Sequence, residues 1–463
     1  MWCPSFLSGP RKEEKGEPRF MVRAKTIEEE DGYDYVGERH LAKPCGLFAS
    51  VMHLVKGALG AGILSGHAAF MRAGAGVALP VTFLLGAYMA FSLYLLLYST
   101  RRLCSRTKIP ILTYPDVGEA SCAVFPNAKV RKLAKLFRYT IDGAIMMDLF
   151  GACCVYQIII SKTAKQLVED LQEVQLEANG PSPHIRIYLL CFLLPIVIIC
   201  LIPHLKWLAP FSFVANLLIL FCVLVTVYYS TIENPTFANV IWVKSFSGVL
   251  QMVGMVIFTI SCACQSIPIE NNMGNPSKFP LALGVGMLGI VTLVSTISFF
   301  GYVAYLEKCQ SPITMNFPMS ILPKIIKVSI AIMVMMTHGL NFWVPFNSGW
   351  YYMKRVHKKS KHIMRWELFY RALCVIIICI IAIVFPQIEA IMGFLGCICL
   401  SNIAFVWPAL VYILVSWDRP GLGICKWRLI LGIILLVLGL FILVVGGSIN
   451  ITTLIKVFME VHM

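Results

Sequence analysis

Long apolar segments recur from residue 47 almost to the C-terminus, and no other feature constrains the fold as strongly. A helix that crosses the hydrocarbon core of a bilayer needs about 20 mainly apolar residues. Segments of this kind occupy residues 47–70, 75–99, 139–161, 185–202, 207–230, 249–268, 281–305, 322–350, 367–385, 388–416 and 427–449. Only 14% of the residues are charged, whereas soluble domains carry about 25%. The sequence therefore predicts an all-α integral membrane protein with about eleven transmembrane helices, and it excludes soluble enzymes, DNA-binding factors and secreted scaffolds.

Lys and Arg residues concentrate in alternate loops between these segments. The formal net charge of +15 would suit a nucleic-acid partner if the charge formed one patch. It falls instead mainly in the N-terminal region and in the loops at 101–138 and 354–365. Cytosolic loops of membrane proteins carry such an excess. The pattern predicts a cytosolic N-terminus, the lipid bilayer rather than nucleic acid as partner and, with an odd number of spans, a C-terminus on the opposite side.

The two ends of the chain are predicted to lie outside the transmembrane domain of residues 46–450. Residues 1–45 are polar, mixed in charge and poor in aliphatic side chains, which is typical of a disordered tail. Their start contains no apolar stretch that would indicate a cleavable signal peptide. Residues 451–463 are predicted to form a short extracellular or lumenal tail. The triplet that begins at Asn450 is a sequon, so Asn450 is a candidate glycosylation site close to the membrane.

The 17 cysteines lie mostly within the apolar segments, as Cys153 and Cys397 do. Cysteines in apolar surroundings behave as small packing residues, so no disulfide framework is predicted. His357 and His362 lie in a basic loop without partners at metal-ligand spacing. We therefore expect no metal, no cofactor and no enzymatic centre.

The first apolar segment is interrupted by Gly57, Gly60 and Gly62. Transporters built from inverted repeats bind their substrate where one helix of each half is unwound, and glycines weaken a helix. Small residues at this spacing also allow two helices to pack closely. From this segment alone, both interpretations stay open.

The sixth segment carries a second interruption. Its centre, residues 259–266, is made of small and polar residues, and Pro268 follows. If residues 47–230 and 249–416 form two repeats of five helices, with 427–449 as an extra helix, the two interruptions occupy corresponding positions. Such a coincidence indicates a substrate site between the repeats, and it favours a transporter.

Ionisable residues within the spans are candidate functional groups, because a charge inside a bilayer is costly. His53 and His67 lie in the first span, Asp148 in the third and His338 in the eighth. A histidine titrates near neutrality, so His53 is a candidate for a coupling proton. The alternative for each is a satisfied buried group or a side chain that reaches the membrane surface, which best fits Lys56, Asp142 and Glu270.

Several motifs resemble those of a known family. The run from His53 to Gly62 follows the pattern H-L-x-K-G-x-x-G-x-G, and the run from Pro268 to Pro280 is close to P-L-E-N-x-M-x-x-P-x-x-F-P. The eighth span contains Leu-Asn-Phe-Trp-Val-Pro from Leu340. In these motifs the chain resembles the proton-assisted, or proton-coupled, amino acid transporters of the amino acid/auxin permease superfamily, the insect branch most closely.

This resemblance implies a LeuT-like fold, in which a five-plus-five inverted repeat contains broken first and sixth helices. It also implies symport of protons with small neutral amino acids such as glycine, alanine and proline, which alternating access would move into the cytosol. The proton would be the coupling ion, and His53 would take part in the coupling. The two breaks would bind the substrate through Gly57, Ala58, Gly60, Ala61, Gly62, Thr259, Ser261, Cys262 and Ala263.

The chain departs from the family pattern at both breaks. The sequence Ile-Ser-Cys around Ser261 replaces an aromatic-Glu-Gly step, His67 replaces a frequent proline, and Ala58 replaces a frequent polar residue. Loss of the acidic group leaves two alternatives open, an amino acid sensor (transceptor) or a family member with an altered substrate and little net transport. The sequence is compatible with the plasma membrane and with the lysosomal or endosomal membrane. It indicates no obligate protein partner.

Overall fold

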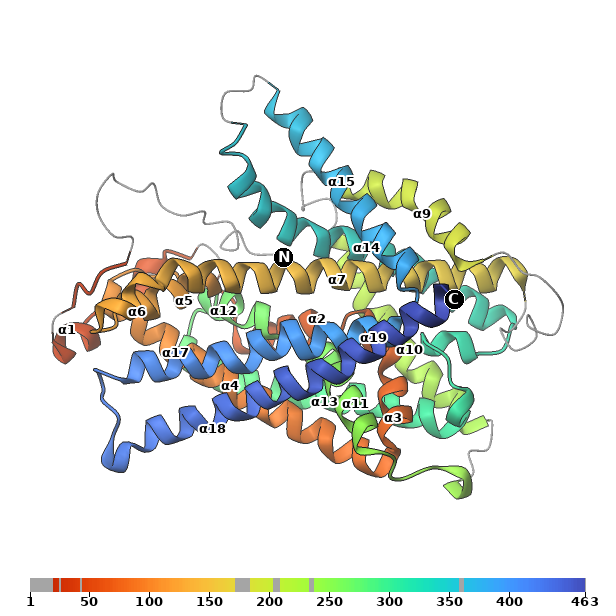
Figure 1. Cartoon of the computed structure of the whole chain (residues 1–463), viewed down its shortest axis with the longest axis horizontal. Coiled ribbons are helices and arrows are strands. Elements are labelled where there is room, and N and C mark those ends of the chain that lie inside the picture. The colour runs from red at the N-terminus through yellow and green to blue at the C-terminus, as the bar shows by residue number, and fades with distance from the viewer. Residues whose placement is uncertain are drawn as a thin grey trace.

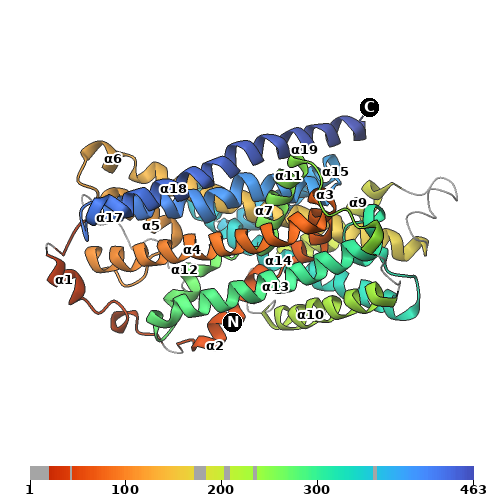
Figure 2. The same ribbon diagram turned by 90° about the horizontal axis from the view of Figure 1, so that it is seen from below.

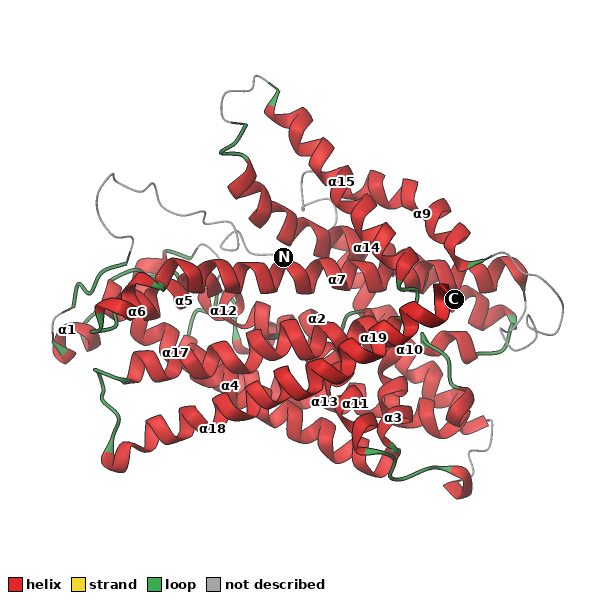
Figure 3. Cartoon of the chain, viewed as in Figure 1, coloured by secondary structure: helices red, strands yellow, loops and turns green. Residues whose placement is uncertain are grey.

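The computed structural model describes residues 20–24, 26–41, 44–170, 184–202, 209–232, 237–357 and 362–462. Across these residues the chain is helical, and no strand forms beyond one isolated bridge between Cys45 and Met273. Most long helices run along one direction (Figure 1), and loops join them mainly at their ends (Figure 3). In the described part, eight helices are long and apolar enough to cross a membrane, and a bent pair brings the number to nine. The predicted all-α membrane class is confirmed.

Helices form at each of the first five predicted spans. The first is divided into α2 (Leu47–Ala58), the short 3₁₀-helix η3 (Ala61–Ser65) and α3 (Gly66–Ala73). The next four are α4 (Ala75–Thr107), α7 (Ala134–Glu169), α9 (Ile185–Cys200) and α10 (Ala209–Ile232). The loop between α4 and α7 contains α5 (Tyr114–Ala123) and α6 (Ala128–Lys132). The predicted boundary between the fourth and fifth spans, residues 203–206, lies outside the described residues.

The remaining predicted spans also coincide with helices. The sixth is divided into α11 (Phe246–Ile260) and α12 (Ala263–Asn271), and it is followed by α13 (Phe279–Tyr305), α14 (Ile321–Met353) and α15 (Ile363–Val384). The tenth consists of α16 (Ile388–Leu395), two π-helical turns, η9 (Gly396–Leu400) and η10 (Asn402–Val406), and α17 (Trp407–Ser416). The eleventh is α18 (Trp427–Phe441), the π-helical turn η12 (Ile442–Gly446) and α19 (Gly447–His462).

Glycine makes the turn between α3 and α4 possible. Gly74 has a φ of +88°, and a Cβ atom there would lie 2.8 Å from the backbone of Trp242. Residues other than glycine rarely adopt this φ. The chain can therefore leave α3 and enter α4 within a single residue.

The two divided spans pack against each other within the bundle. Helix α3 contacts α11 and α13, and α2 contacts α12 and α13. Helix α7 packs along α14, α5, α9 and α16. Figure 2 shows α10 beside α13, and it shows α18 and α19 as one continuous helix at the edge of the bundle. A Cβ atom on Gly396 would overlap the carbonyl oxygen of Gly254, so α11 and η9 meet backbone to backbone.

Residues 20–24 and 26–41 pack against the bundle, so in these residues the prediction of a disordered tail is wrong. Helix α1 (Ile27–Asp31) forms in this region. Its Glu30 is 1% exposed and pairs with Arg106 at 3.2 Å and Arg419 at 2.8 Å. The charge pairs act together with the buried side chain of Phe20. The backbone N–H groups of Arg23 and Ala24 also donate to the Arg106 carbonyl.

The last helix continues past its predicted end at residue 449. Helix α19 ends at His462, and its Phe458 packs against Phe385 with ring centroids 5.8 Å apart. Residues 451–462 are therefore helical, and they extend a span that the apolar pattern alone ended too early.

Asn450 lies inside this helix and is 3% exposed. Its side-chain amide donates a hydrogen bond to the carbonyl of Gly446 at 2.9 Å. A glycan needs an accessible amide nitrogen, so this position contradicts the candidate glycosylation at Asn450.

The 16 cysteines of the described part are all free thiols. Cys191 and Cys425 are exposed, and most of the others are buried. Their burial agrees with the role of small packing residues.

Candidate functional site

The first predicted span is broken between α2 and η3. Leu59 closes α2 in a non-helical conformation, and Gly60 is extended with φ −98° and ψ −160°. The axes of the two parts, Leu47–Ala58 and Gly62–Ala73, differ by 50°. The break therefore falls within the predicted glycine cluster, and it leaves backbone groups of both helix ends without partners in their own helix.

The sixth predicted span is broken at Ser261 and Cys262. Ser261 is extended with φ −70° and ψ 124°, and α12 begins at Ala263. The hydroxyl of Ser261 lies 3.5 Å from the backbone nitrogen of Ala263, from which it accepts a hydrogen bond. The C-terminus of α11 thus presents carbonyl groups and the N-terminus of α12 presents N–H groups, with the partial charges of the two helix dipoles.

The two breaks lie side by side. Thr259 contacts the Gly62 carbonyl at 3.5 Å through its hydroxyl, which also donates to Met255 within α11 at 2.8 Å. Gln265 donates from its amide to the Gly57 carbonyl at 3.2 Å. A Cβ atom at Gly62 would lie 3.3 Å from the Thr259 Cα. The glycines therefore allow the backbones of the two helices to approach each other. Both interpretations of the glycine cluster apply: it breaks the helix and it permits close helix packing.

The structure places all nine predicted substrate residues at or next to these breaks. Ala58 is the last residue of α2, and Ala61 opens η3 directly after Gly60. Ser261 and Cys262 form the second break between Thr259 and Ala263.

Three polar residues beside the breaks were missed by the sequence analysis. A Cβ atom at Gly60 would lie 3.0 Å from the hydroxyl of Tyr156, which accepts a hydrogen bond from Asn341 at 2.6 Å. Tyr156 comes from α7 and Asn341 from α14, so four spans converge here. Gln265, on α12, faces Gly57. Asn341 belongs to the motif that begins at Leu340, yet that motif does not reveal which of its side chains faces the break.

His53 lies on α2 four residues before Gly57 and is half-buried. Among the described residues it makes no hydrogen bond or ion pair. Its role in proton coupling therefore remains a prediction.

The other histidines of the spans are buried and hydrogen-bonded. His67 is 1% exposed, and its Nε2 donates to the Gln310 carbonyl at 2.9 Å. His338 is fully buried, with Nε2 3.3 Å from the Gln157 amide nitrogen and Nδ1 3.5 Å from the Cys200 sulfur. The contacts of His338 suit the interpretation of a satisfied buried group, whereas Nδ1 of His67 has no hydrogen-bond partner among the described residues.

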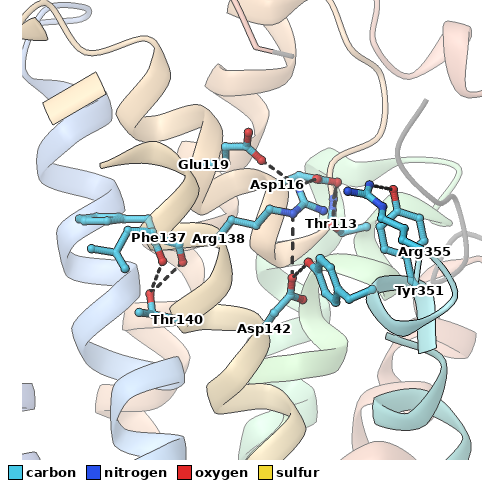
Figure 4. Close-up of polar contacts among 11 residues, drawn as sticks. Thr113, Asp116, Glu119, Phe137, Arg138, Thr140, Asp142, Tyr351 and Arg355 are labelled. Atoms are coloured by element: carbon cyan, nitrogen blue, oxygen red, sulfur yellow. Dashed lines mark hydrogen bonds and ion pairs between the residues drawn. The ribbon is translucent and has the colours of Figure 1, made fainter. Parts of the chain in front are cut away.

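Two further charged groups of the spans are ion-paired. Glu270, which is fully buried, pairs with Arg101 of α4. At the start of α7, Arg138 contacts Asp116 at 2.6 Å, Glu119 at 2.8 Å and Asp142 at 3.9 Å. Figure 4 shows Arg138 reaching these carboxylates from its helix. This network joins α5 to α7, and it confirms that Asp142 is a satisfied polar group.

The fold and the paired breaks define a class of protein, the membrane transporters with broken helices. A family model described as transmembrane amino acid transporter protein matches residues 43–452. The chain belongs to this family, as its motifs predicted, and it is a transporter rather than an enzyme.

Two relatives share most of the chain. The chain is 28% identical over 416 residues to the proton-coupled amino acid transporter-like protein pathetic of Drosophila melanogaster, with 88% of this chain and 85% of that protein covered. It is 20% identical over 423 residues to the probable amino acid transporter skat-1 of Caenorhabditis elegans, covering 89% and 90% of the two chains.

Solved structures of distant transporters share the fold. The inward-facing conformation of Mhp1 matches with a TM-score of 0.52 at 12% identity, covering 91% of this chain and 92% of that chain. A mutant of the manganese transporter from Eremococcus coleocola matches with a TM-score of 0.51 at 12% identity, covering 89% and 87%. These similarities confirm the predicted LeuT-like fold with its broken first and sixth helices.

Proposed function

We propose that this protein moves small neutral amino acids, of the glycine, alanine and proline type, into the cytosol together with protons. One observation carries the proposal: the breaks at Gly60 and Ser261 lie side by side within a bundle of membrane-spanning helices. Irregular backbone at membrane depth is tolerated only where it is buried in protein or lines a polar cavity. An amino acid zwitterion can satisfy such backbone groups with its own two charges.

The polarity of the broken helices suggests how the zwitterion binds. The N-terminus of α12, which begins at Ala263, would hold the substrate carboxylate through backbone N–H groups. The C-termini of α2 and α11 would hold the ammonium group through carbonyl oxygens. Because Ser261 carries no charge, carbonyl groups and the hydroxyls of Ser261 and Tyr156 would replace a carboxylate as partners of the amine.

The glycines indicate the size of the substrate. Tyr156 lies against Gly60, and Gln265 occupies the space beside Gly57. A small substrate side chain would displace these two groups least. This crowding supports glycine, alanine and proline over aromatic or long-chain amino acids.

Alternating access would be driven by protonation, for which His53 is the candidate on α2. A protonated state that favours the outward-open conformation loads substrate from an acidic side, and deprotonation toward the cytosol follows release. The N-terminus would then be cytosolic, in the plasma membrane or in a lysosomal or endosomal membrane. An epitope tag at the N-terminus should be reached by antibody only after the cells are permeabilised.

Uptake of labelled glycine, alanine and proline tests the proposal in cells that express the chain, at external pH values of about 5.5 and 7.5, which span the histidine range. Surface delivery is measured in parallel. We expect uptake to rise at the lower pH and to become less dependent on pH in His53→Gln. Uptake by wild type that is equal at both pH values would contradict proton coupling.

The second candidate function is an amino acid sensor with little net transport. The break in the sixth span, Ser261 to Ala263, carries no charge. This favours the sensor, because neutral groups alone bind the ammonium group of an amino acid weakly. Purified protein in liposomes distinguishes the two. Substrate accumulated against its gradient excludes the sensor, whereas ligand-dependent thermal stabilisation without accumulation supports it. In that case Ser261→Glu should restore accumulation.

A further inference from the structure

Asp148 is a buried carboxyl group without a visible counter-charge. It lies on α7 and is 7% exposed. Its Oδ1 atom has no hydrogen-bond partner among the described residues, and no Lys, Arg or His of the described part pairs with it. An ionised carboxylate in this position would be very costly. A protonated, neutral carboxyl group avoids this cost.

The surroundings of Asp148 are apolar or weakly polar. Its titratable neighbours are the thiols of Cys264 on α12, Cys399 in η9 and Cys153 on α7 itself. The closest charged group along α7 is Asp142, which is already bound by Arg138 and by the hydroxyl of Tyr352 at 2.7 Å. Asp148 is thus separate from that network and has no fixed positive charge to neutralise it.

Its position links it to the broken sixth helix. Cys264 is the second residue of α12, so Asp148 lies beside the first turn after the break. On the same helix, Tyr156 lies about 12 Å further along and contacts the first break at Gly60. Helix α7 therefore presents a hydroxyl to one break and a carboxyl group to the other. Movement of α12 away from α7 would uncover the side of Asp148 that faces Cys264.

We propose that Asp148 carries the coupled proton, an inference that rests on the proposed proton-coupled transport. The carboxylate takes a proton from hydronium, which leaves as water, when the site is hydrated. The neutral carboxylic acid is then stable while α12 packs against α7. Movement of α12 rehydrates the group, which returns the proton to water as hydronium on the other side. Substrate binding at the breaks and proton binding at Asp148 are coupled because both depend on the position of α12.

The test compares Asp148→Asn, which keeps the shape but cannot titrate, with Asp148→Glu, which can. Asp170→Asn serves as the matched control, since Asp170 lies at the exposed end of the same helix. Purified proteins in liposomes are assayed for labelled amino acid exchange and for proton influx with an internal pH-sensitive dye. We expect Asp148→Asn to exchange amino acid but to lose substrate-driven proton influx, and we expect Asp148→Glu and Asp170→Asn to retain both.

Proton influx that persists in Asp148→Asn overturns the inference, whatever the result for His53→Gln. Loss of exchange in both Asp148 variants also overturns it, because the residue would then be structural. Infrared spectroscopy gives a readout independent of turnover: the carbonyl band of a protonated carboxylic acid in wild type should be missing in Asp148→Asn. If wild type transports no amino acid yet shows this band, the proposed function fails and the protonation of Asp148 stands. If the band is absent, the inference fails.

Discussion

Gln265 occupies the space in which a side chain on Gly57 would lie. Its amide holds the Gly57 carbonyl at 3.2 Å, across the junction of α2 and α12. The end of a glutamine side chain is mobile, so a larger residue at position 57 can displace it without unfolding the bundle. Such a substitution alters the site and leaves the fold intact.

We expect Gly57→Ala to reduce amino acid uptake while the protein still reaches the membrane in normal amounts. The added methyl group displaces the Gln265 side chain and removes its hydrogen bond to α2. The double variant Gly57→Ala with Gln265→Ala removes the overlap and should recover part of the uptake. Kinetics of uptake for the three proteins measure this coupling, and equal losses in the single and double variants would refute the steric explanation.

The residues at the breaks show how far the sequence predicts the site. The glycines and small residues of α2 and α11 were found, because a broken helix needs residues with weak helical preference. Tyr156, Asn341 and Gln265 were not, because their neighbours come from other helices and depend on the packing. The buried state of Asp148 was equally invisible, since a sequence gives the type of an ionisable group and not its partners.

At the scale of the elements, the sequence predicts where the helices lie better than where they end. The helices coincide with the apolar segments because hydrocarbon length fixes the number of residues in a span. The ends extend beyond the predicted limits, as α4 to Thr107 and α19 to His462 show. Polar turns continue these helices outside the apolar part, and the apolar pattern gives no signal there.

The N-terminal segment that contains α1 shows how buried charge pairs help to hold a polar element. We expect Glu30→Gln to weaken its packing by about 3–5 kcal/mol, because Arg106 and Arg419 would lose their shared buried partner. Limited proteolysis should then cleave this segment faster. The exposed Glu28 provides the control, and Glu28→Gln should leave the cleavage rate unchanged. Equal rates in both variants and in wild type would show that the pairs do not anchor the segment.

At the scale of the whole molecule, one close contact joins the first and the last span of the second repeat, which are the sixth and the tenth spans of the chain. Gly254 of α11 and Gly396 of η9 meet backbone to backbone, with Gly393 beside them. A helix that carries a substrate break is thereby fixed to the tenth span. In the proposed alternating access, this contact would couple any movement of α11 to that of η9.

Gly396→Ala should therefore destabilise the protein by about 1–3 kcal/mol or more, the range seen for overpacked sites. The added Cβ atom cannot be accommodated by moving a side chain, because the obstacle is the main chain of Gly254. Gly284→Ala is the matched control, since a Cβ atom there meets nothing within 4 Å. Thermal unfolding in detergent measures both, and a Gly396→Ala protein as stable as the control would contradict the packing described.

The uneven exposure of the thiols makes the protein suitable for fluorescent labelling. Replacing the exposed Cys191 and Cys425 and the half-buried Cys45 and Cys374 with serine would leave Cys264 as the partly accessible thiol of the described part, and the buried cysteines would stay unlabelled under native conditions. The half-buried Cys264 then becomes a chemical reporter at the junction with α12. Its alkylation rate would follow the opening of that junction in real time, without any engineered cysteine at the substrate site.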